Sequence, residues 1–108
     1  MVEIKKIITL DAYNTILSEE KCILKFYADW CAPCRVLTST IQNLDNEKAK
    51  DIHFGEINVE DDFAEGIIQD YQIRGIPVLL FFKNGELIDR TVGNVPSSKI
   101  LEIIEKMN

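Results

Sequence analysis

The sequence predicts an α/β domain in which four helices flank a mixed five-stranded sheet, in the order β-α-β-α-β-α-β-β-α. Short apolar runs rich in branched and aromatic residues alternate with segments whose apolar positions recur at helical spacing. Near the end of the chain an Asn-Gly pair directly joins two such runs, which predicts a hairpin and hence an antiparallel strand. At 108 residues, without internal repeat or linker, the chain is expected to form a single domain over residues 1–108.

Composition and charge narrow the possible functions. Apolar residues make up 46% and charged residues 28% of the chain, which is typical of a globular protein. The net charge is −6 without any basic run, which argues against nucleic acid or an anionic membrane as a partner. No apolar run reaches the ~20 residues of a membrane helix, and the N-terminus lacks the apolar core of a signal peptide. We therefore expect a cytoplasmic protein, and we expect it to be a monomer.

The first half of the chain predicts two strands and two helices. Residues 2–10 alternate loosely and predict a short strand, after which Asp11 is expected to cap a helix. The apolar run at residues 22–27 predicts a buried strand. Apolar positions at helical spacing then predict one continuous second helix over residues 34–50.

The second half predicts three strands and two helices. Residues 52–59 alternate between apolar and polar side chains, as in a half-buried strand. A helix is expected to begin at residue 61 or 62, although Gly66 within it costs about 1 kcal/mol relative to alanine. The remaining predicted elements are a strand at residues 74–82, a turn at Asn84-Gly85, a strand at residues 87–92 and a helix beginning near Pro96.

Two cysteines separated by two residues lie where the second predicted strand ends and the next helix begins. Cys31 would lie at the helix N-terminus, where free N–H groups and the helix dipole favour a thiolate. Cys34, one turn further, would face the same side, close enough for the two sulfurs to meet. Pro33 suits the first turn because its missing N–H would have no partner there. A CxxC pair near a βαβ pattern, without an export signal, indicates thiol–disulfide redox chemistry.

A metal site is the alternative for a CxxC pair, but the chain offers few further ligands. Zinc normally takes four ligands, and beyond the pair only Cys22 and His53 are available. We therefore expect no bound metal, and without a GxGxxG loop we expect no bound nucleotide cofactor either. Cys22 lies within an apolar strand and is interpreted as a small core residue.

The chain resembles a thioredoxin over essentially its full length. The segments that carry the resemblance, in the family's order and spacing, are residues 26–34 (Phe-Tyr-Ala-Asp-Trp-Cys-Ala-Pro-Cys), 74–77 (Arg-Gly-Ile-Pro), 82–85 (Phe-Lys-Asn-Gly) and 92–93 (Val-Gly). The resemblance implies the thioredoxin fold and a protein disulfide reductase whose only redox group is the Cys31–Cys34 disulfide. Cys31 would attack a disulfide of a client protein as thiolate, and Cys34 would resolve the mixed disulfide. An NADPH-dependent thioredoxin reductase would then recharge the pair.

The resemblance also implies a groove for the client around the cysteines. Pro77 would carry a cis peptide bond after Ile76 and face the cysteines, and Trp30 would help to dock the client. Only ~5–6% of X–Pro bonds are cis in folded proteins, so the cis bond follows from the resemblance alone. The residues implied for the groove are Trp30, Ala32, Pro33, Gly75, Ile76, Pro77, Val92 and Gly93.

Two charged positions depart from the family pattern. Lys25 stands where the family has a buried aspartate, thought to move protons for the resolving thiol, and Glu56 stands where a lysine is common. We expect an ion pair of reversed polarity, which avoids a lone buried charge. A charged Lys25 would favour thiolates and make the protein more oxidising. A neutral Lys25 could act as a base, and a Lys25 that snorkels to solvent would have no effect.

Three functions therefore remain open at the level of sequence. The first is a disulfide reductase, which the intact CxxC favours. The second is a binding module that holds a partner in the same groove without redox turnover. The third is a less reducing oxidase or isomerase of disulfides. The replacement of the family's aspartate by Lys25 leaves the second and third open, although the missing export signal disfavours the third.

Overall fold

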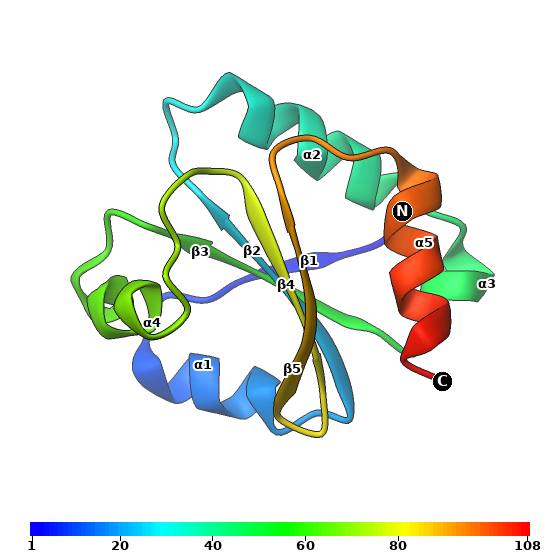
Figure 1. Ribbon diagram of the computed structural model, residues 1–108, viewed down its shortest axis with the longest axis horizontal. Helices are drawn as coiled ribbons and strands as arrows, with labels where there is room; N and C mark the ends of the chain where they lie inside the picture. Colours follow the sequence, from blue (N-terminus) through cyan, green and yellow to red (C-terminus); the bar gives the residue numbers. More distant parts are fainter.

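A central sheet of five strands, with helices on both faces, forms the frame of the protein (Figure 1). The computed structural model describes all residues, 1–108. The strands are β1 (Ile4–Lys6), β2 (Lys21–Tyr27), β3 (His53–Asn58), β4 (Val78–Lys83) and β5 (Glu86–Val92). They lie in the order β1-β3-β2-β4-β5, in which β1, β3 and β2 are parallel and both β4 pairings are antiparallel. The predicted α/β class with a mixed five-stranded sheet is confirmed.

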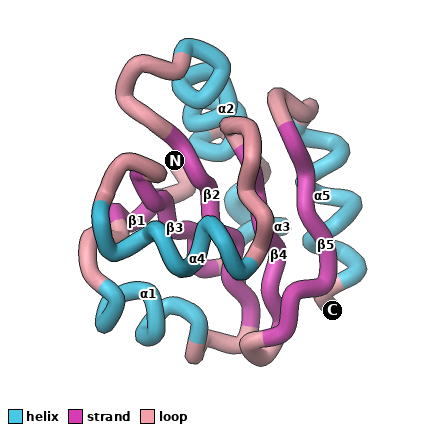
Figure 2. The backbone as a smooth tube through the Cα atoms, turned by 60° about the vertical axis from the view of Figure 1, so that its left-hand side comes forward, coloured by secondary structure: helices cyan, strands magenta, loops and turns pink.

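The helices cover the sheet in two groups, as Figures 1 and 2 show. They are α1 (Leu10–Leu17), α2 (Ala32–Gln42), α3 (Asn46–Ala49), α4 (Glu65–Asp70), preceded by a 3₁₀ turn η1 (Asp62–Ala64), and α5 (Ser97–Lys106). Apolar side chains of α1 and α4 pack against one face of the sheet, and those of α2, α3 and α5 against the other. No helix is both long enough and apolar enough to cross a membrane.

The single helix expected over residues 34–50 is wrong, because the segment forms two helices, α2 and α3. Helix α2 ends at Gln42, and Asp45 begins a new helix by accepting hydrogen bonds from the N–H groups of Glu47 and Lys48 at 2.9 and 3.2 Å. An aspartate that can bond nearby backbone N–H groups prefers a cap to a helix interior. The chain therefore has five α-helices rather than the expected four.

Several element boundaries also differ from those expected. Helix α1 is capped by Thr9, whose hydroxyl oxygen accepts from the N–H of Ala12 at 3.1 Å, whereas Asp11 lies within the first turn. A carboxylate in a first turn is favoured by the helix dipole even when it makes no cap. Strand β4 begins only at Val78, after Pro77, which has no N–H to donate to a neighbouring strand.

The predicted Asn-Gly hairpin joins β4 to β5. Asn84 and Gly85 have φ angles of 52° and 80°, so both occupy the left-handed region that a two-residue hairpin turn requires. The turn makes β5 antiparallel to β4, as expected. Because β5 forms one edge of the sheet, β4 lies inside it, and β2 lies inside it between β3 and β4.

The alternation of side chains along β2 positions the functional residues. Leu24 packs into the apolar cluster under α1 and α4, whereas Ile23 packs into the cluster under α2 and α5. Successive residues of a strand point to opposite faces. Lys25 therefore points to the α2 side, and β2 then leads directly into the loop that carries the cysteines.

Candidate active site

Cys31 and Cys34 lie at the N-terminus of α2, joined by a disulfide with Cα atoms 5.3 Å apart. Cys31 is the N-cap residue, and its sulfur accepts a hydrogen bond from the N–H of Cys34 at 3.2 Å. Pro33 occupies the first turn, as predicted. Cys31 is 4% exposed and Cys34 only 1%. The slightly more exposed residue of the pair, Cys31, therefore lies where free N–H groups and the positive end of the helix dipole stabilise negative charge.

The segment before β4 packs against the cysteine pair. The peptide bond between Ile76 and Pro77 is cis, and Ile76 contacts the small cluster that contains both cysteines. The N–H of Gly93 donates to the carbonyl oxygen of Pro77 at 2.8 Å, so the end of β5 is tied to this segment. The structure thus brings together the cysteines and the 76–77 and 92–93 segments.

Two large apolar side chains stand exposed at this end of the molecule. Trp30 is 68% exposed and Val92 is 65% exposed. The indole Nε1–H of Trp30 donates to Glu60 Oε2 at 3.1 Å, which holds the ring beside the cysteines rather than leaving it free. The other residues expected in the groove that are exposed are Ala32, Pro33 and Gly75. Exposed apolar surface around a pair of sulfurs is a surface suited to another protein chain.

The expected ion pair between Lys25 and Glu56 is present. The two residues are direct register partners on β2 and β3, and Lys25 Nζ lies 3.2 Å from Glu56 Oε2. Lys25 is only 2% exposed, so the hypothesis that its amine snorkels to solvent is wrong. Burial lowers the pKa of Lys25 from its usual value because it disfavours the ammonium, while the Glu56 carboxylate opposes that shift.

Sequence reasoning missed two further contacts of Lys25. Its Nζ donates a hydrogen bond to Thr38 Oγ1 on α2 and lies 4.8 Å from the centre of the Tyr27 ring. Thr38 is four residues after Cys34, which on a helix places it on the same side one turn further. That spacing is a signal in the sequence, but the rotation of α2 on the sheet decides whether Thr38 meets Lys25.

Glu56 links the buried Lys25 to the surface of the protein. Its second oxygen, Oε1, lies 3.8 Å from Nζ of Lys6, which is well exposed on β1. The Lys6 amine also lies 5.8 Å from the centre of the Tyr27 ring. One carboxylate therefore joins a buried and an exposed lysine, and two lysines contact one aromatic ring.

Cys22 takes no part in this site. It is fully buried in the cluster under α1 and α4, and burial raises the pKa of its thiol to about 12. A buried thiol of that kind is a structural residue, as predicted.

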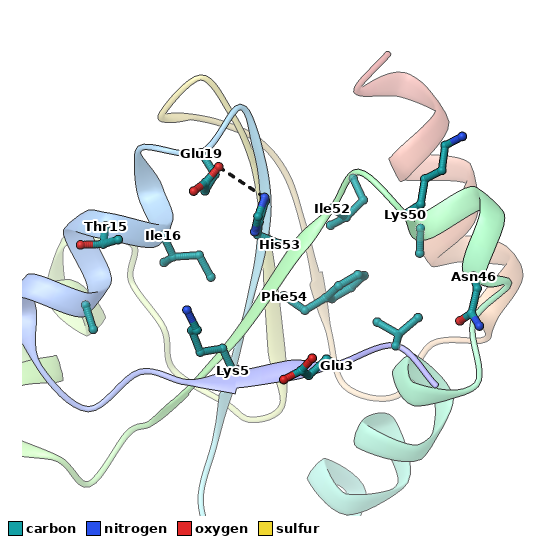
Figure 3. A pocket seen from close by; sticks show the side chains of 13 residues that line it. Glu3, Lys5, Thr15, Ile16, Glu19, Asn46, Lys50, Ile52, His53 and Phe54 are labelled. Atoms are coloured by element: carbon teal, nitrogen blue, oxygen red, sulfur yellow. Dashed lines mark ion pairs between the residues drawn. The ribbon is translucent and has the colours of Figure 1, made fainter.

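A cavity of about 770 Å³ lies apart from the cysteines (Figure 3). It opens at the start of β3, between α1 and α3, whereas the cysteines follow the end of the parallel strand β2. His53 Nε2 lies 3.3 Å from Glu19 Oε2 at its rim. The remaining charged side chains around it carry both signs. No group of three or more histidine, cysteine, aspartate or glutamate side chains is arranged so that it could hold a metal ion. The redox pair, rather than this cavity, is the candidate active site.

Comparisons with known proteins agree with this assignment. The family model "Thioredoxin" matches residues 4–106. The chain is 39% identical over 89 residues to a chloroplastic M-type thioredoxin of Spinacia oleracea, covering 82% of this chain but 48% of that longer protein. It is 33% identical over 88 residues to a thioredoxin of Mycoplasmoides gallisepticum, covering 82% of this chain and 85% of that one.

Solved structures show the same similarity. A Malassezia sympodialis thioredoxin, 27% identical, superposes with a TM-score of 0.83 over 99% of this chain and 92% of its own. A mutant thioredoxin of Halobacterium salinarum, 24% identical, superposes with a TM-score of 0.85 over 97% of this chain and 90% of its own, which bears on the fold alone.

Proposed function

This chain belongs to the thioredoxin family, and on that premise we propose that it reduces disulfides of client proteins through Cys31 and Cys34. Thiol–disulfide oxidoreduction is the chemistry of the family and of an intact CxxC pair. The observation that carries the assignment of roles is the position of Cys31. It caps α2 and is slightly more exposed than Cys34, at 4% against 1%, so Cys31 is the residue placed to attack and Cys34 the one placed to resolve.

The reaction runs in two exchanges. The Cys31 thiolate attacks one sulfur of the client disulfide, which forms a mixed disulfide and releases the first client thiolate. The Cys34 thiolate then attacks Cys31, which forms the Cys31–Cys34 disulfide and releases the second client thiolate. Two electrons have passed from the cysteine pair to the client, and the released thiolates take up protons from solvent.

The surface around the cysteines would hold the client in an extended conformation. Ile76 is half-buried against the pair, and the turn at Gly93 is tied to the carbonyl oxygen of the buried Pro77, so both segments border the surface beside the cysteines. Trp30 and Val92 would supply apolar contact on either side. Such a site recognises backbone and general apolar character, which suits a protein that serves several clients.

Recharging the disulfide requires a reductant from outside the chain. We propose an NADPH-dependent thioredoxin reductase as the source of the two electrons, with this protein acting as a cytoplasmic monomeric carrier. A cytoplasmic setting, in which thiols are kept reduced, suits a pair that must return to the dithiol form.

A less reducing role is the second candidate, and the hydrogen bond from Lys25 Nζ to Thr38 on α2, the helix that carries the cysteines, favours it. A cation beside the pair stabilises thiolates and hence the reduced form, which makes a CxxC pair more oxidising. Oxidation or isomerisation of client disulfides would follow if the potential were high enough.

The test is reduction of a disulfide-bonded model protein in the presence of NADPH and a thioredoxin reductase. Cys31→Ser should abolish turnover, and Cys34→Ser should accumulate the mixed disulfide with the client. Cys22→Ala is the matched control, because Cys22 is buried outside the site, and it should retain turnover. Turnover that survives Cys31→Ser would refute the proposal, and retained client binding without turnover in the unmodified protein would establish a binding module.

A further inference from the structure

Thr38 connects the redox helix to the buried lysine. Its Oγ1 hydroxyl donates to the carbonyl oxygen of Cys34 at 3.2 Å, one turn earlier on α2. A hydroxyl has a single proton, so once that proton is given to Cys34 the oxygen can only accept from Lys25 Nζ. Hydrogen bonding thus fixes the direction of this chain of contacts: Lys25 donates to Thr38, and Thr38 donates to Cys34.

The surroundings of Lys25 match an ammonium group. An ammonium has three N–H donors and no acceptor. Three partners surround it, namely Thr38 Oγ1, Glu56 Oε2 at 3.2 Å and the Tyr27 ring at 4.8 Å. Two hydrogen bonds and an aromatic ring therefore surround the ammonium, and such compensation is the condition under which a buried charge is tolerated.

Only one of these three partners lies on the helix that carries the cysteines. Glu56 is on β3 and Tyr27 is on β2, so both hold the ammonium to the sheet. Glu56 also contacts Lys6 at 3.8 Å, toward the surface. Without the Thr38 hydroxyl, the remaining attractions would draw the Lys25 amine toward β3 and away from α2.

We propose that Thr38 is a positioning residue for the redox pair: its hydroxyl holds the Lys25 ammonium against the first turns of α2, where the charge favours the thiolate form of the reduced cysteines. The inference rests on the proposed function, because it concerns the same pair. A positive charge near a thiol favours its ionised form. Stabilising the reduced form in this way makes the pair more oxidising. Thr38 thereby sets the reduction potential through Lys25 without touching a client.

The first test is Thr38→Val, which removes the hydroxyl and keeps the branched shape. We expect the equilibrium constant for reduction of the pair by glutathione to fall about tenfold, or about 30 mV for this two-electron couple. Thr38→Ser keeps the hydroxyl and should stay close to the unmodified protein. Thr40→Val is the matched control, because Thr40 makes the same bond to a carbonyl four residues earlier, also at 3.2 Å, without contacting a lysine. It should leave the constant unchanged.

A double-mutant cycle separates positioning from a local effect on the helix. If Thr38 acts through Lys25, Thr38→Val should shift the constant in the unmodified protein and have no further effect in Lys25→Met. An equal shift in both backgrounds, or no shift in either, would overturn the inference. Titration of the thiols by ultraviolet absorbance supplies a second readout, in which Thr38→Val should raise the pKa of the attacking thiol and Thr38→Ser should restore it.

The outcomes separate this inference from the proposed function. An unchanged constant in Thr38→Val, in a protein that reduces clients, would refute the coupling and leave the reductase in place. A tenfold shift in a protein that fails to reduce clients would refute the reductase and support the coupling.

Discussion

The two faces of β2 have different chemistry. On the side covered by α1 and α4, Cys22, Leu24 and Phe26 are fully buried in a wholly apolar cluster. On the side covered by α2, Lys25 and Tyr27 lie among ionic and aromatic contacts beneath the cysteines. The residues alternate within one strand because successive side chains point to opposite faces.

The two faces of β2 contribute differently to the stability of the fold and to the chemistry of the redox pair. Burial of apolar side chains stabilises the fold by roughly 25 cal/mol per Å², whereas burial of a cation opposes it. The chain places its buried cation only on the face that it shares with the redox helix. We conclude that the α1 side of β2 serves stability and that the α2 side also serves the redox pair.

The largest expected contrast lies between the cysteines of the two sides. A thiol whose pKa is about 12 has roughly 1,000-fold less thiolate than one at its ordinary pKa. In the reduced, folded protein, iodoacetamide should therefore modify Cys31 and leave Cys22 intact, as followed by mass spectrometry. Modification of Cys22 at a similar rate would contradict the division, and denaturant should expose Cys22 as a positive control.

Truncation on the apolar face should affect stability alone. Leu24→Ala should lower the free energy of unfolding by about 2–5 kcal/mol, because it leaves a cavity in a fully buried cluster. Urea denaturation measures the loss, and the glutathione equilibrium of the pair should stay at its original value. A shift in that equilibrium would show that the two sides are not separable.

Removing the carboxylate on the other face should cost less. Glu56→Gln should lower the free energy of unfolding by about 1–3 kcal/mol, because a hydrogen bond between charged groups is replaced by one to a neutral amide. Glu56 is also partly exposed, so water offsets some of the loss. Glu60→Gln, on an exposed carboxylate, is the control and should change stability little. Equal losses from both substitutions would contradict the structural role of the buried pair.

The smallest effect is the dependence of stability on pH. The folded pKa of Lys25 is lowered below 10.5, so between the two values the unfolded chain binds more protons than the folded one. Stability contributed by this group therefore rises as pH increases through that window. The free energy of unfolding of the unmodified protein should therefore rise relative to that of Lys25→Met as the pH increases through this window. A fall in the stability of the unmodified protein relative to Lys25→Met as the pH rises would show that the pKa of Lys25 is raised instead.

Much of this organisation could be predicted from the sequence. The strand–CxxC–helix pattern places the cysteines, and the family spacing places the cis proline. Lys25 and Glu56 could be paired because each departs from the family pattern with a charge opposite to the usual one, and their register on β2 and β3 confirms the pair. Local pattern alone places the cysteines, whereas the cis proline and the ion pair could be predicted only through the family resemblance.

The remainder depends on tertiary geometry. Thr38 meets Lys25 only because of the rotation of α2 on the sheet, which helical periodicity does not specify. The break before α3 depends on the side chain of Asp45 bonding to backbone N–H groups instead of facing solvent within a longer helix. Apolar spacing alone predicts a continuous helix there, because a capping bond does not interrupt the hydrophobic pattern.

Neighbouring substitutions on the two faces of β2 test most directly whether the buried cation tunes the redox pair. Lys25→Met and Leu24→Met place the same side chain at adjacent positions of β2, and the equilibrium of each variant with glutathione gives its reduction potential. We predict that Lys25→Met lowers the constant for reduction of the pair about tenfold or more, about 30 mV or more, and that Leu24→Met leaves it unchanged. Equal constants in the two variants would contradict the claim that the buried cation tunes the pair.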